Sequence, residues 1–175
     1  WATGVALDEQ VAHSGRRSLR VSAHGGFQSA LAAYPGGRAR VTAWMRTEGV
    51  VPGPSAPWHM AALQLISYDA QRQPVGHHDI ALIEGTRDWT PYDGTAILSR
   101  DVAFVSVHCH IWGEDARGTV WFDDLSLSFP DAAALPPRAP LDLERAAVTV
   151  DLAKPLGEFP HLWIGSDVGY SDRVL

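Results

Sequence analysis

The sequence has 175 residues, of which 46% are hydrophobic and 19% are charged, and its formal net charge at pH 7 is −6. This length suffices for one domain with its own core, and the composition is that of a globular chain rather than a disordered or membrane-spanning one. An acidic chain without a basic cluster is not expected to bind nucleic acid, and the single cysteine, Cys109, excludes a disulfide framework.

Short runs of alternating apolar and polar residues, separated by turns that contain Gly, Pro or Asp, follow one another along the chain. Such runs predict β-strands with one buried side and one solvent-facing side. The Pro- and Gly-rich segment 49–57 predicts a loop that ends at Trp58, and residues 77–79 predict a turn. Strands are predicted at 4–7, 18–23, 27–34, 38–47, 61–68, 79–83 and 95–98.

Segment 104–129 predicts two long strands joined by a turn that contains glycine. In the first strand an apolar side alternates with a polar side that carries His108, His110 and Trp112. In the second strand Asp123 has the parity of the apolar residues that follow it. It is therefore expected to point inward, where a carboxylate needs a cation or several backbone amides as partners. Together the strands predict an all-β jelly-roll β-sandwich of two antiparallel sheets, since no stretch before residue 140 has a helical period.

Several side chains expected opposite the core are of types that bind sugars. Aromatic rings stack on the C–H faces of a sugar, while Gln, Arg and His form hydrogen bonds with its hydroxyls. Strand parity places six of them on one face, and Trp58 stands on the neighbouring loop as a rim platform or a loop anchor. Alternatively, a loop covers Trp44 and the histidines only face solvent. Trp89 and Trp121 are expected to be structural. The expected carbohydrate-binding residues are Trp44, Arg46, Gln64, His108, His110, Trp112 and Trp58.

The composition changes after Phe129. Residues 130–146 contain four prolines and predict a linker, and residues 147–175 contain a strand-like run at 147–152 followed by a short apolar run at 161–165. A tail of this length is too short to form a second domain. The predicted organisation is a β-sandwich at 1–129, a linker at 130–146 and a tail at 147–175.

Along the first 129 residues stand five motifs, in the order SGRRSLRV, GGRARVTAWMR, AALQLISYDAQ, TRDWTPY and GTVWFDDLSL. In this order they resemble the jelly-roll carbohydrate-binding modules of families 4, 9 and 22. The resemblance implies that a polysaccharide or oligosaccharide binds on the concave sheet. It also implies a structural calcium ion with Asp123 among its ligands. The glutamate that supplies another calcium ligand in such modules, on an opening Phe-Glu strand, has no counterpart in this sequence.

The tail sequence VTVDLAKPLGEFPHLWIGSDVGY is similar to the first barrel strand and following loop of glycoside hydrolase family 39. This similarity implies a downstream glycosidase domain whose catalytic glutamates lie beyond residue 175. No catalytic residue is therefore assigned in this chain, and no hydrolase activity of its own is expected. An arginine-rich composition without asparagine is typical of a GC-rich bacterial source, and the expected protein is a secreted, extracellular accessory module.

Two other functions are considered. His108, His110 and Glu114 have the His-x-His-x3-Glu spacing of the first cupin motif, and three such ligands could hold a transition metal. Segment 155–161 matches the second cupin motif only loosely. The other alternative is a structural sandwich that braces a catalytic barrel and binds no ligand. A sheet face without an exposed aromatic platform would favour it.

Overall fold

The computed structural model describes residues 2–56 and 58–132, and the regular structure in these ranges is entirely β-strand. The predicted all-β class is therefore confirmed. Within the same ranges no helix is long and apolar enough to cross a membrane. The strands are β1 (Ala2–Asp8), β2 (Ser18–Gln28), β3 (Ala32–Ala33), β4 (Arg38–Val51), β5 (Ala61–Tyr68), β6 (Pro74–Ile83), β7 (Gly85–Ile97), β8 (Phe104–Ile111) and β9 (Arg117–Ser128).

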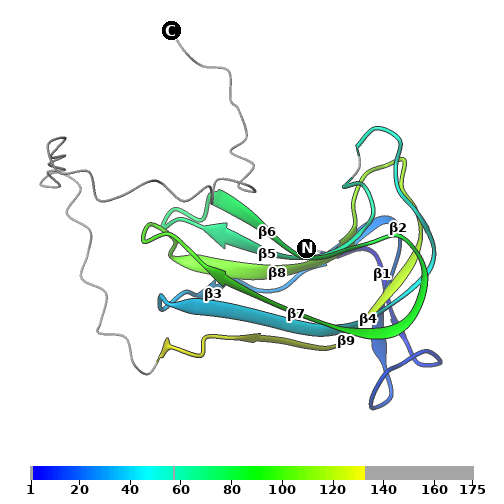
Figure 1. Ribbon diagram of the computed structural model, residues 1–175, viewed down its shortest axis with the longest axis horizontal. Coiled ribbons are helices and arrows are strands. Elements are labelled where there is room, and N and C mark those ends of the chain that lie inside the picture. The colour runs from blue at the N-terminus through cyan, green and yellow to red at the C-terminus, as the bar shows by residue number, and fades with distance from the viewer. Residues whose placement is uncertain (1, 57, 133–175) are drawn as a thin grey trace, which may run out of the picture. The chain divides into compact units, whose positions relative to one another are not determined.

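The strands form two antiparallel layers around one core (Figure 1). The first layer, here called the β5 layer, consists of β6, β5, β8 and the end of β2, with the short β3 paired to β8. The second, here called the β4 layer, consists of most of β1, the start of β2, β9, β4 and β7, while Ala2 and Thr3 of β1 pair with the end of β2 in the first layer. This arrangement confirms the predicted sandwich.

Strand β2 belongs to both layers. Residues 18–22 pair with β9, whereas residues 26–28 pair with β8. The sequence predicts separate strands at 18–23 and 27–34, but β2 runs through Gly25 and Gly26 between them and passes there from one layer to the other. Glycine in a strand interior suits such a passage because it has no side chain to restrict the bend.

Alternate residues of both layers fill the space between them with apolar side chains. The core is continuous across the two layers and includes the thiol of Cys109, whose pKa is raised by burial. The largest fully buried apolar side chains of this core are Met45, Leu63, Leu65, Ile111, Val21, Val41, Val105, Val107 and Val120.

Two edge strands are longer than the sequence predicts. The segment 77–79, predicted as a turn, lies in the middle of β6 and pairs with β5. Strand β7 begins at Gly85, although the sequence predicts a strand only at 95–98. Both strands lie at the ends of the hydrogen-bonded order, where polar residues and even Pro91 are tolerated because one side of the strand needs no partner.

The prediction that Asp123 points inward is wrong. Phe122 is buried in the core and Leu127 packs against it, so the inward parity changes between these two residues. Asp124 has a φ of 48°, and the pairing of β4 with β9 shifts between Thr42 and Trp44. These are the features of a β-bulge, which adds one residue to β9. Asp123 therefore lies opposite Trp44 on the outer side of the β4 layer.

The start of the predicted linker is attached to the sandwich. Asp131 accepts hydrogen bonds from the backbone amide and the guanidinium of Arg38, with 2.7 Å between Nη2 and Oδ1. The rest of the linker and the tail at 147–175 lie outside the described residues, so the predicted domain boundaries stay predictions.

Candidate functional site

The outer side of the β5 layer carries polar and aromatic side chains in cross-strand register. Asp79, Gln64, His108 and Gln28 are neighbours across four strands. The adjacent row consists of Leu82, Ala62, His110 and Gly26. We call this surface the histidine face. It is formed by Gly26, Gln28, Ala62, Gln64, Ile66, Tyr68, His77, Asp79, Leu82, Phe104, Ser106, His108, His110 and Trp112.

One hydrogen-bond network on this face is centred on Gln64. Its Oε1 lies 2.8 Å from Nε2 of His110, and its Nε2 donates to Oδ1 of Asp79 at 2.5 Å. The network joins β6, β5 and β8 through side chains alone. It places an exposed carboxylate at one end and a buried imidazole at the other.

A second network surrounds His108. Its Nε2 lies 3.0 Å from Oγ of Ser106 and 3.3 Å from the hydroxyl of Tyr68. Gln28 donates from Nε2 to the same Tyr68 hydroxyl at 3.0 Å. These side chains come from β2, β5 and β8, so four strands contribute hydrogen-bonding groups to the histidine face.

Both imidazoles in these networks are neutral at physiological pH. Burial lowers the pKa of His110 to about 4, with a smaller effect of nearby His77. Burial also lowers the pKa of His108 to about 4, with further contributions from His110 and His77. A neutral imidazole donates one hydrogen bond and accepts another, as a sugar hydroxyl does. The pair therefore supplies hydrogen bonds rather than positive charge.

Two tryptophans are exposed beside this face. Trp112 directly follows β8, is 50% exposed, and lies edge-on to His110 with ring centroids 5.3 Å apart. Trp58 is 54% exposed on the loop between β4 and β5. The backbone amide of Trp112 donates to the carbonyl of Met60 at 3.1 Å, so the two tryptophan-bearing segments are hydrogen-bonded to each other.

Three side chains join the loop between β4 and β5 to the loop between β8 and β9. They are Ser55, His59 and Asp115, and we call this set the loop latch. Nδ1 of His59 lies 2.8 Å from Oδ1 of Asp115, and the backbone amide of Ser55 donates to Oδ2 of Asp115, also at 2.8 Å. Hydrogen bonds from Ser55 hold the pKa of Asp115 well below its usual range. Gly113 has a φ of 90°, and a Cβ there would lie 2.3 Å from Nδ1 of His59. The close approach of the two loops therefore requires glycine at this position.

The loop latch has the residue types of a Ser-His-Asp hydrolase triad without its geometry. In such a triad the serine and the carboxylate contact different ring nitrogens. Here Oγ of Ser55 lies 2.9 Å from Nδ1 of His59, which is the nitrogen that also contacts Asp115. The three residues therefore form a structural contact between loops.

The predicted single binding face is divided between the two layers. Gln64, His108, His110 and Trp112 lie together on the histidine face, and Trp58 lies beside Met60 at one end of it. Trp44 and Arg46 lie on β4, which pairs with β7 and β9, so they are on the opposite side of the molecule. Strand parity identifies which side chains face away from the core, but it does not tell which layer a strand joins.

Trp44 and Arg46 make contacts with other side chains of the fold. His13 stacks on Trp44, and the guanidinium of Arg46 lies over the ring of Trp121 at 5.3 Å from its centroid. Trp121 is 6% exposed and donates from Nε1 to Oδ2 of Asp8 at 2.9 Å, which confirms its expected structural role.

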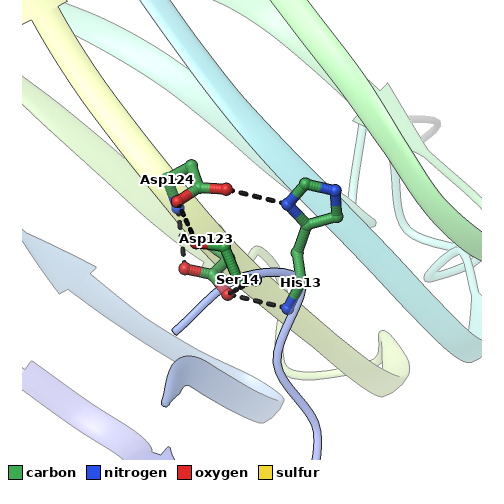
Figure 2. A network of polar contacts seen from close by, with 4 residues as sticks. All are labelled: His13, Ser14, Asp123 and Asp124. Atoms are coloured by element: carbon green, nitrogen blue, oxygen red, sulfur yellow. Dashed lines mark hydrogen bonds and ion pairs between the residues drawn. The ribbon is translucent and has the colours of Figure 1, made fainter. Parts of the chain in front are cut away.

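Asp123 and Asp124 are occupied by hydrogen-bond donors from the loop between β1 and β2 (Figure 2). Oδ2 of Asp123 accepts from the backbone amides of His13 and Ser14 at 2.8 and 3.1 Å. Oδ2 of Asp124 lies 2.8 Å from Nδ1 of His13, and Oδ1 accepts from the Ser14 hydroxyl. Backbone amides thus fill the position that the sequence assigns to a cation, and this donor set does not fit a calcium ion, which takes six to eight oxygen ligands.

The described part of the chain holds no group of three His, Cys, Asp or Glu side chains that could bind a metal. His108 and His110 share a face as the cupin spacing requires, with ring centroids 6.4 Å apart, but their hydrogen bonds go to Ser106, Tyr68 and Gln64. The second cupin segment, 155–161, lies outside the described residues. The geometry gives no support to the cupin alternative.

Comparison with solved structures identifies the fold. One structure titled "Family 16 Carbohydrate Binding Module-2" matches with a TM-score of 0.51 at 17% identity, covering 74% of this chain and 88% of that one. A xylan-binding domain of family 22 matches at 0.51 and 15% identity, covering 73% and 81%. The C-terminal family 22 module of Clostridium thermocellum Xyn10B matches at 0.50 and 18%, covering 73% and 82%. The fold is that of carbohydrate-binding modules.

The likeness to carbohydrate-binding modules is found by comparing structures and not by comparing sequences. No protein-family model and no curated protein matches it. The resemblance to jelly-roll carbohydrate-binding modules is thus confirmed at the level of the fold, whereas the family 39 similarity of the tail falls on residues outside the described ranges.

Several residues of the histidine face are absent from the sequence prediction. Gln28, Tyr68 and Ser106 complete the network around His108, and Asp79 completes the one around Gln64. The parity of strands 61–68 and 104–112 already places Tyr68 and Ser106 on the polar side. For Asp79 the signal is ambiguous, because this residue ends the predicted turn at 77–79 and begins the predicted strand at 79–83.

Proposed function

We propose that this chain is a carbohydrate-binding module that holds a polysaccharide on the histidine face, against Trp112 and Trp58. The observation that carries this proposal is the pair of half-exposed indoles beside a surface whose other side chains form hydrogen bonds. Large exposed aromatic side chains next to convergent polar groups are typical of binding surfaces. The same observation disfavours a sandwich that only braces a neighbouring domain, because that function needs no aromatic platform.

The charge of the histidine face favours neutral sugars. None of the residues named for it is a lysine or arginine, its two most buried histidines are neutral at physiological pH, and the nearby guanidinium of Arg72 lies over the ring of Phe104, 5.9 Å from its centroid. Asp79 is its single carboxylate. A polymer of uronic acids would place further negative charges beside Asp79, where like charges repel each other. Xylan, β-glucan and mannan are therefore the preferred candidate classes, and acidic polymers are disfavoured.

Affinity gel electrophoresis tests the proposed function directly. Purified chain is run through gels that contain xylan, β-glucan, mannan or polygalacturonate, with a gel without polymer as reference. We expect retardation in at least one neutral polymer and none in polygalacturonate. Trp112→Ala should abolish the retardation, and Trp44→Ala, a matched indole deletion on the opposite layer, should leave it unchanged. Unretarded migration of the folded protein in every gel would overturn the proposal.

We further propose that the module is the accessory part of a secreted bacterial glycoside hydrolase. Support comes from the similarity of residues 148–170 to the opening of a family 39 barrel. Determining the gene sequence on both sides of this segment tests the idea. A signal peptide upstream and a glycosidase barrel downstream are expected, and an unrelated downstream domain would exclude it.

A further inference from the structure

The amide of Gln64 has only one orientation that satisfies its neighbours. On one side lies Oδ1 of Asp79, 2.5 Å from the amide nitrogen, and on the other lies Nε2 of His110, 2.8 Å from the amide oxygen. An ionised carboxylate only accepts hydrogen bonds. The NH₂ group of Gln64 therefore faces Asp79, and its carbonyl oxygen faces His110.

This orientation sets the tautomer of His110. A carbonyl oxygen only accepts, so Nε2 of His110 carries the ring proton and donates it to Gln64. Burial lowers the pKa of the ring to about 4, so the imidazole carries a single proton at neutral pH. The other nitrogen, Nδ1, is consequently a hydrogen-bond acceptor.

Nδ1 of His110 is buried and has no hydrogen-bond partner within the described part of the chain. His110 as a whole is only 3% exposed. Buried polar atoms in folded proteins almost always have a partner. The hydrogen bond to Gln64 fixes the His110 ring, but the acceptor Nδ1 takes no part in it. We infer that a ligand supplies the donor for this atom.

The residues that pair with His110 across the strands are small. Its cross-strand neighbours are Ala62 on β5 and Gly26 on β2, whose side chains are the smallest on the histidine face. Trp112 lies edge-on beside the imidazole and is half exposed, so one side of it is accessible to a ligand. A sugar ring that contacts this indole brings its hydroxyls next to the imidazole.

We propose that His110 determines the specificity of this site. Its Nδ1 accepts a hydrogen bond from a hydroxyl of a neutral sugar that contacts Trp112, and Asp79 positions the acceptor through Gln64. The inference rests on the proposed function and deepens it, because an acceptor selects a hydroxyl at this point and rejects a carboxylate.

The tautomer can be measured without any glycan. Long-range ¹H–¹⁵N correlation spectra of the ¹⁵N-labelled chain distinguish the two neutral forms of a histidine, and the His110→Gln spectrum assigns the signal. We expect the form protonated at Nε2 in the wild type. In Asp79→Asn we expect a mixture of both forms, because an asparagine presents either an oxygen or an NH₂ group to Gln64 and no longer fixes its amide. A purely structural role of Asp79 would leave the tautomer unchanged.

Calorimetry with soluble xylan, β-glucan and mannan measures the contribution to binding. His110→Gln keeps an NH₂ donor for Gln64, but its amide oxygen no longer presents an acceptor at the position of Nδ1, and it should bind the preferred polymer about tenfold more weakly. Asp79→Asn should weaken binding less. The matched control is Asp93→Asn, which removes the ion-pair partner of Arg40 on the opposite layer and should bind like the wild type.

The outcomes separate this inference from the proposed function. A wild-type tautomer protonated at Nδ1, or full affinity in a folded His110→Gln variant, overturns the inference while the module still binds glycan. If no polymer binds the wild type, the proposed function fails and the sugar part of the inference fails with it. The tautomer spectra then still decide whether Asp79 and Gln64 orient His110.

Discussion

His13 stacks on Trp44, with ring centroids 3.8 Å apart and ring planes 14° from parallel. The same imidazole also meets Trp89 edge-on at 5.7 Å and contacts Asp124 through Nδ1. The loop between β1 and β2 is thereby held over the β4 layer, and the indole of Trp44 lies beneath it. This is the arrangement that the sequence leaves open as the alternative to sugar binding at Trp44.

Trp44→Ala should therefore affect stability rather than binding. Removing the indole leaves His13 without its stacking partner and should lower the free energy of unfolding by about 2 kcal/mol, below the full cost of deleting a wholly buried aromatic side chain. Urea denaturation measures the loss, and calorimetry with the preferred glycan should find the affinity unchanged. A stable variant that has lost glycan affinity would move the binding site to the β4 layer.

Trp112→Ala should show the opposite pattern. An exposed indole contributes little to the core, but stacking against a sugar removes apolar area from water. We expect a loss of about 2 kcal/mol of binding free energy, roughly 30-fold in affinity, with the melting temperature nearly unchanged. His108→Ala, which removes a hydrogen-bonding group and no stacking surface, should weaken binding less. An unfolded Trp112→Ala chain would show that this indole is structural.

The stability of the sandwich should fall as the pH is lowered from about 6.5 to about 4. In the unfolded chain the imidazoles of His108 and His110 titrate near 6.5, whereas in the folded chain both pKa values are about 4. In this window the unfolded state binds more protons, so acid shifts the equilibrium towards unfolding, and below about pH 4 the effect levels off. For the buried His110 the full loss is about 3 kcal/mol, and the half-buried His108 contributes less.

Urea denaturation at a series of pH values checks this dependence. His110→Gln should remove most of the slope between pH 6.5 and 4, because glutamine does not titrate. The carboxylates with lowered pKa values also begin to lose their stabilising effect below about pH 5, but this loss is the same in wild type and variant and so cancels in the comparison. A slope that is the same in wild type and variant would show that other groups control acid stability.

The loop latch should matter for binding more than for folding. His59→Ala removes the ring that contacts Asp115 and should leave the segments of Trp58 and Trp112 less firmly held. Affinity should fall roughly fivefold, about 1 kcal/mol, because the free loops must be ordered when the glycan binds. Calorimetry measures the affinity, and His24→Ala, at an exposed position on β2, is the control. Unchanged affinity would mean that the loops are positioned by backbone contacts alone.

Calcium is implied by the family resemblance, and chelation tests it. Because Asp123 and Asp124 are occupied by donors from His13 and Ser14, we expect the melting temperature to be the same in excess chelator and in millimolar calcium chloride. A melting temperature that rises with calcium would show that the ion binds, and Asp123→Asn would then tell whether this carboxylate is a ligand.

The sequence predicts the strands and the polar side of each, because a period of two residues is a local property. Parity puts His108 and His110 on one side of β8, as the structure shows, and Trp112, which follows the strand, lies beside His110. Which strands become neighbours is decided by long-range pairing, and no local pattern tells that β4 pairs with β7 and β9 while β5 pairs with β8. The division of the predicted site into two faces follows from this difference.

The error at Asp123 has a separate physical cause. A β-bulge changes parity with a single residue, and here it depends on Asp124 adopting a left-handed backbone conformation. Aspartate tolerates this conformation better than most residues, but nothing in the residues alone requires it. His59 and Asp115 were missed because their contact joins two loops of unpredictable path, 56 residues apart.

The shared strand β2 also determines when the sandwich can form during synthesis. Apart from β1, its partners are β8 and β9, the last strands of the sandwich. The two layers are therefore joined at β2 only after residues 104–128 have left the ribosome. Pairings between segments so distant in sequence form slowly, because the intervening chain loses entropy before the contacts compensate for it. The order of the strands thus makes closure a late step, and the edge of β2 that pairs with β8 and β9 stays open until those strands have been made.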